Sequence, residues 1–166
     1  MSAQELVRLR PIVMPDLKKL AATFENENET DLDPAYLESL FQQCRFTRVA
    51  LGSLGPAIPV ESDLGGGMGN FGMLNIYLPA HGSYRRIIAE AGFGPKFLST
   101  PGPVPDLVFG WAGGVCHATY SRYHYQTGSY ISSACNQEVE GKGDSCAIKT
   151  CEGSKLPKFP NPWPNS

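Results

Sequence analysis

Residues 15–44 read PDLKKLAATFENENETDLDPAYLESLFQQC, and this stretch decides the fold that the sequence predicts. Its apolar side chains recur twice at the i, i+3, i+4, i+7 spacing of an amphipathic helix, first as Leu17, Leu20, Ala21 and Phe24, then as Leu37, Leu40, Phe41 and Cys44. Pro15 suits a first turn, and Asp33 with Pro34 suits an N-cap and a first helical position. Because each helix is too short to persist alone, we expect the pair to pack against the rest of the chain.

Beyond residue 44 the helical spacing ends and glycine and proline interrupt the chain repeatedly. Residues 46–51 and 73–78 are predicted to be short strands, and residues 83–91 a short helix that Ser83 caps and Gly92 closes. The apolar, aromatic stretch 107–125 fits either a helix or a pair of strands. The predicted fold is therefore α+β: an N-terminal helix pair and an irregular Gly/Pro-rich middle with short antiparallel strands.

The last eleven residues, LPKFPNPWPNS, are predicted to form an extended Pro-rich arm over residues 156–166. Residues 1–155 are predicted to form a single compact domain. Phe159 and Trp163 lie between prolines in this arm, where an extended chain cannot bury them in a core of its own. We expect them to dock in a groove of a neighbouring subunit, as proline-rich segments do.

The overall composition narrows the class of partner. Charged residues make up 18% of the 166 residues, below the roughly 25% of typical soluble domains, while the chain holds 18 glycines and 14 prolines. The net charge is −2 and lysine and arginine form no cluster, so we expect no nucleic-acid partner. No signal peptide is seen and no apolar run is long enough to span a membrane. We expect a cytoplasmic protein or one assembled into a particle, with a secreted domain left open.

The cysteines are concentrated near the C-terminus. Four of the five, Cys116, Cys135, Cys146 and Cys151, lie between residues 116 and 151 in a segment with little apolar material. A cross-link stabilises such a segment by restricting the unfolded chain, so one interpretation is at least one disulfide, with three ways to pair the four. A reducing compartment would instead keep every thiol free. Cys44 falls on the apolar stripe of the second helix and is predicted to be a core thiol.

A second interpretation makes Cys116 a catalytic nucleophile. A reactive thiol needs a base that takes its proton and a third group that orients the base. His124 or His81 is the candidate base, and Asp106 or Asp144 is the candidate orienting carboxylate. This reading predicts a cysteine-dependent hydrolase or transferase.

A third interpretation is a small metal-binding module. Cys146 and Cys151 are separated by four residues, which fits one half of a structural zinc site. The second half would have to combine Cys116 with His117, His124 or Cys135, and none of these has the usual spacing. We therefore expect no metal and no cofactor.

The sequence favours a non-enzymatic role over either chemical site. Low charge, abundant turns and an aromatic arm together predict a structural or accessory subunit of a larger assembly. Examples are a virion or tail component, or a subunit of a multi-protein complex. Its partners are expected to be other protein subunits, identical or different.

Overall fold

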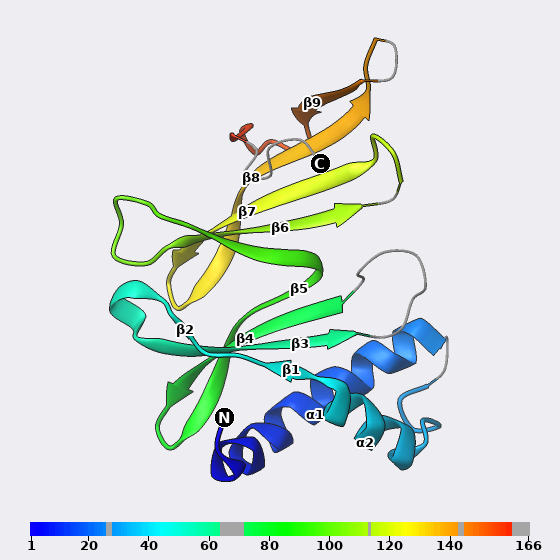
Figure 1. Ribbon diagram of the computed structural model, residues 1–166, viewed down its shortest axis with the longest axis vertical. Helices are drawn as coiled ribbons and strands as arrows, with labels where there is room; N and C mark the ends of the chain where they lie inside the picture. The colour runs from blue at the N-terminus through cyan, green and yellow to red at the C-terminus, as the bar shows by residue number, and fades with distance from the viewer. Residues whose placement is uncertain (26–27, 64–71, 113, 143–144, 161–166) are drawn as a thin grey trace.

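A large antiparallel sheet, and not a helix pair with a few short strands, makes up most of the molecule. The computed structural model describes residues 1–25, 28–63, 72–112, 114–142 and 145–160 (Figure 1). The described strands form one nine-stranded sheet in the order β1-β3-β4-β5-β6-β7-β8-β9, and β2 also pairs with β3. Successive strands from β3 onward are neighbours in the sheet, so the chain runs as a meander. The predicted α+β class is wrong.

The strand bounds follow the chain closely. They are β1 Arg45–Phe46, β2 Val49–Ala50, β3 Pro56–Asp63, β4 Gly72–Ala80, β5 Ser83–Leu98, β6 Asp106–Ala112, β7 Ala118–Gln126, β8 Ser129–Glu140 and β9 Cys146–Thr150. A short 3-10 helix, Gly52–Leu54, follows β2. The strand predicted over residues 73–78 is confirmed within β4. The stretch 107–125 resolves as two strands, β6 and β7.

Two helices precede the sheet in the described part of the chain. The second, α2, spans Pro34–Gln43 as predicted, and the Asp33 carboxylate accepts a hydrogen bond from the Ala35 N–H at 2.9 Å. The first, α1, spans Ala3–Glu25 and contains both Pro11 and Pro15, so Pro15 does not begin it. A capping box that the prediction missed begins α1: the Glu5 N–H donates to Ser2 Oγ at 3.3 Å, and the Ser2 N–H donates to the Glu5 carboxylate at 2.9 Å.

The helix predicted over residues 83–91 is wrong, because these residues belong to β5. The first part of β5 pairs with β4, and the part from Phe93 to Leu98 pairs with β6. The strand bends between the two parts at Gly92, whose φ is +133°. A Cβ on Gly92 would lie 2.1 Å from the Gly110 carbonyl oxygen, so only glycine fits. Pairing with β4 supplies the backbone partners that override the local helical spacing of residues 83–91.

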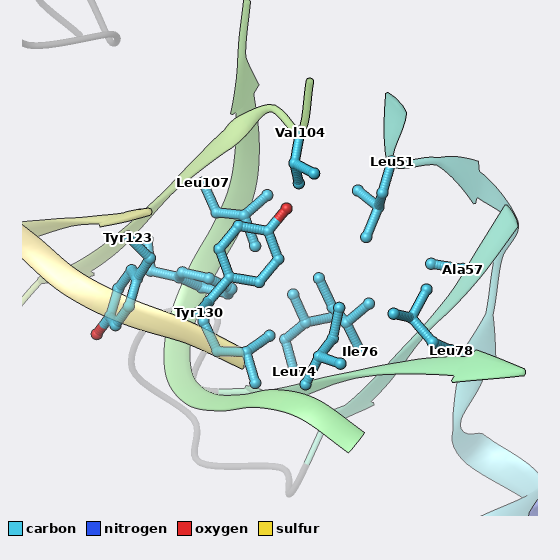
Figure 2. Packing of buried hydrophobic residues seen from close by; sticks show 12 residues of the cluster. Leu51, Ala57, Leu74, Ile76, Leu78, Val104, Leu107, Tyr123 and Tyr130 are labelled. Carbon is cyan, nitrogen blue, oxygen red and sulfur yellow. The ribbon is translucent and has the colours of Figure 1, made fainter. Parts of the chain in front are cut away.

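The bend gives the sheet two halves that face each other across the main core (Figures 1 and 2). Leu74, Ile76 and Leu78 alternate along β4 and point toward Leu107, Tyr123 and Tyr130 of the second half. The opposite face of the first half is covered by α1. There, a second core joins Leu9, Val13, Leu17, Phe41, Cys44, Ile58, Val60 and Tyr77. Alternate side chains of the same strands thus fill two separate cores.

Candidate functional site

The four C-terminal cysteines lie in two pairs whose sulfur atoms are at bonding distance. The Cys116 and Cys146 sulfurs are 1.95 Å apart, and those of Cys135 and Cys151 are 1.85 Å apart. This arrangement is compatible with the disulfide prediction. Cys146 is the first residue of β9 and Cys151 follows its last, so one end of this five-residue strand is tied to the β6–β7 connection and the other to β8.

The fifth cysteine, Cys44, is unpaired and buried beside α1, as expected of a core thiol. Its Sγ lies 3.3 Å from the Leu40 carbonyl oxygen, to which it donates. Burial raises the pKa of the Cys44 thiol to about 11. Since the thiolate is the reactive form, Cys44 is chemically inert in the folded protein.

The proposed nucleophile, Cys116, has another cysteine as its partner in the structure. Cys116 is only 6% exposed and its sulfur faces Cys146, so it carries no thiolate in this state. His81 lies far along the chain in the β4–β5 turn with a φ of +44°. Asp144, the alternative orienting carboxylate, lies outside the described residues.

The structure does join His124 to Asp106. Asp106 is 2% exposed, and one of its oxygens lies 2.8 Å from His124 Nδ1. The other oxygen accepts from Arg122 Nε at 2.7 Å. The β6–β7 register creates this cluster, because Leu107 pairs with Tyr123 and Val108 with Arg122. The buried carboxylate is thereby compensated by one permanent cation and one imidazole. Arg122 was not singled out from the sequence, and only the register reveals it.

Phe159 of the arm is buried against its own chain. It is 5% exposed and packs with Val108, Ala118, Tyr120 and Ala134 on the face of the C-terminal half opposite the main core. We call this set of four side chains, together with Asn136, the Phe159 seat. The premise that the arm cannot fold on its own domain is therefore wrong for Phe159. Trp163 lies outside the described residues.

Asn136 of β8 holds the arm by its backbone. Its amide nitrogen donates to the Phe159 carbonyl oxygen at 2.7 Å, and its amide oxygen accepts from the Phe159 N–H at 3.1 Å. Asn136 is 0% exposed, so these bonds form out of contact with water. The Cys135 N–H donates to the Pro157 carbonyl oxygen at 3.1 Å, which continues the contact of the arm along β8.

The strand β9 forms an edge of the sheet, and the direction of its backbone groups can be worked out. The Cys151 N–H donates to the Cys135 carbonyl oxygen, so Cys151 and alternate residues back along β9 face β8. Ile148 therefore faces away from β8. In agreement, its carbonyl oxygen accepts from Lys158 Nζ at 2.8 Å. The backbone groups of Ile148 and Thr150 thus point away from β8.

A hollow of about 430 Å³ opens near the bend of β5. Its walls include Leu74 and Phe93 together with the ion pair between Arg45 and Glu61. Glu90, paired with Leu74 across the strands, is half-buried, and burial raises the pKa of its carboxyl group while a hydrogen bond with Tyr123 lowers it. Glu90 is not among the residues that line the hollow, whose charged side chains are Arg45 and Glu61.

Comparisons add no known relative: no protein family matches this chain, and no similar curated protein or solved structure was found. Among the described residues, no three His, Cys, Asp or Glu side chains gather as metal ligands would. Within the same part of the chain, neither helix combines the length and apolar character needed to cross a membrane.

Proposed function

We propose that this protein is a non-enzymatic structural or accessory subunit that binds a second copy of itself through the edge strand β9. The observation that carries the proposal is the pair of cysteine links at the two ends of β9. A short strand at a sheet edge would otherwise fray, and the links fix its backbone groups in an extended, rigid row. Rigid edge strands with open backbone groups are the template for pairing with another strand.

The residues of β9 suit antiparallel pairing about a twofold axis at Ile148. In that arrangement Ile148 of one copy faces Ile148 of the other, and the two exchange their outward N–H and C=O groups. Lys149 then lies opposite Ala147, so the two lysines do not face each other across the new ladder. The bond from Lys158 does not block the contact, because a carbonyl oxygen has two lone pairs.

The state of the cysteines also supports a binding role over the two chemical alternatives. Cys116 and Cys146, the residues required for a thiol nucleophile and for a zinc pair, face each other instead. The Asp106–His124 contact provides an oriented imidazole, but no described nucleophile donates to it. Its best-supported role is to hold β6 and β7 together.

The test measures the molar mass by light scattering over a series of protein concentrations. Ile148→Pro removes the outward N–H without removing a ladder bond to β8, and edge positions of this kind tolerate proline. Ile148→Val is the matched control, because it keeps the N–H and the β-branched side chain. We expect the wild type and Ile148→Val to double in mass as concentration rises, and Ile148→Pro to remain at 18.0 kDa. A wild type that stays at the single-chain mass at every concentration contradicts the proposal.

A further inference from the structure

The contact between the arm and the Phe159 seat has the chemistry of a peptide-binding site. The Asn136 amide bonds to both the N–H and the carbonyl oxygen of Phe159. Because both bonds are to the backbone, they do not depend on which side chain the arm residue carries. The seat then selects one large apolar side chain, because Ala118 and Ala134 leave room between Val108 and Tyr120. We infer that this seat is an exchangeable segment-binding site, and that its partner in an assembly is the arm of a second copy of this chain.

The arm can leave its seat without unfolding the sheet. Its described contacts with the domain are formed by residues 157–159 and reach side chains or backbone groups of β6, β7, β8 and β9, with Phe93 and Leu98 of β5 packed against the same cluster. The connection back to Cys151 runs through residues 152–156, which belong to no helix or strand. Gly153 in this connection has a φ of +71° and open space around its Cα. The connection therefore works as a hinge, and the links at β9 stay in place when it moves.

An arm from another copy can make the same contacts. Each contact joins the arm to the domain, so an exchanged arm loses none of them, as in domain swapping. The difference between the two states is the tether: a short tether supplies an effective concentration on the order of millimolar. Exchange is therefore favoured where copies are held side by side, as in the assembly that the proposed function describes. The inference rests on that proposed function for its setting, but its test does not require β9.

Two complementary variants separate the seat from the arm. Phe159→Ala leaves the seat intact but removes the anchor that fills it. Asn136→Asp leaves the arm intact but places a carboxylate oxygen against the Phe159 carbonyl, so the arm is released. Ala134→Leu fills the seat and serves as a second arm donor if Asn136→Asp fails to fold. Each variant also carries Ile148→Pro, so that pairing through β9 does not contribute to the mass.

The experiment mixes the two variants at equal concentration and measures mass by native mass spectrometry and light scattering. Each variant alone is expected to stay at 18.0 kDa, and the mixture to form a one-to-one pair of twice that mass. A donor that carries both Asn136→Asp and Phe159→Ala is the control and should form no pair. Folded variants that stay at the single-chain mass when mixed at near-millimolar concentration overturn the inference. That result does not affect the proposal that β9 pairs with a second copy. If Ile148→Pro abolishes self-association and the two variants also form a pair when mixed, both the β9 proposal and this inference are supported.

Discussion

Replacing Asp106 with asparagine tests whether the His124 cluster is a structural clamp. The buried Asp106 carboxylate accepts from Arg122 Nε at 2.7 Å and lies 2.8 Å from His124 Nδ1. Removing one partner of a buried ion pair costs about 3–5 kcal/mol when both charges are out of water. The Arg122 and His124 side chains are 31% and 52% exposed, so water partly compensates them. We therefore expect Asp106→Asn to lower the free energy of unfolding by roughly 1.5–3 kcal/mol.

Equilibrium urea unfolding at neutral pH, followed by far-UV circular dichroism, measures this loss. The melting temperature should fall by about 3–12 °C, given about 2–4 °C per kcal/mol for a chain of this size. A double-mutant cycle with Arg122→Gln should give a coupling free energy of at least about 1 kcal/mol. Glu38→Gln, which breaks the exposed pair with Arg10, is the control and should cost much less. Equal losses for Asp106→Asn and Glu38→Gln, or no coupling to Arg122, would refute the reasoning.

Three further perturbations follow from single sites. Burial raises the pKa of the Glu90 carboxyl group, so the folded state favours its protonated form. The protonated carboxyl group therefore adds to the free energy of unfolding at acid pH, and this stabilisation is lost as the pH rises through the raised pKa. In urea titrations, Glu90→Gln should therefore raise the free energy of unfolding at pH 7–8 and lose that advantage at about pH 4. An advantage of the variant that grows as the pH falls would contradict this reasoning. Cys44 should resist iodoacetamide at pH 8 until urea unfolds the protein, and rapid labelling of the native protein would contradict its burial. Reduction of the two linked cysteine pairs should raise the intact mass by about 4 Da. Gly92→Ala should lower the free energy of unfolding by at least about 2 kcal/mol, since the new Cβ meets the Gly110 carbonyl oxygen at a positive φ. Gly82→Ala is the control: Gly82 also has a positive φ but open space around it, so this variant measures the cost of the backbone conformation without the clash.

Local signals in the sequence predicted the elements that depend on local contacts. The apolar spacing and Asp33 cap gave α2 correctly, because capping and periodicity act within a few residues. The same reasoning failed at β5. Ile87 and Ile88 fit a helical stripe, but this part of the strand pairs with β4, and the strand then continues into a ladder with β6. A pairing between distant segments has no signature in the spacing of one segment.

The candidate sites depended on register in the same way. His124 and Asp106 were predicted as a base and its orienting group, and the β6–β7 register does bring them together. The cysteine pairing was left open among three alternatives, because only the β8–β9 register places Cys135 beside Cys151. The docking of Phe159 on its own domain was missed, because nothing in the sequence around Asn136 indicates that its side chain is buried and binds the backbone of the arm.

Hydrogen exchange at the Ile148 amide, followed against protein concentration, tests the β9 edge most directly. We expect fast exchange in dilute protein, since this N–H faces away from β8, and slower exchange as molecules pair. The Lys149 amide, which faces β8, should be protected at every concentration. If the molar mass rises with concentration while Ile148 exchange stays unchanged, the molecules associate elsewhere and the proposed role of this edge is contradicted.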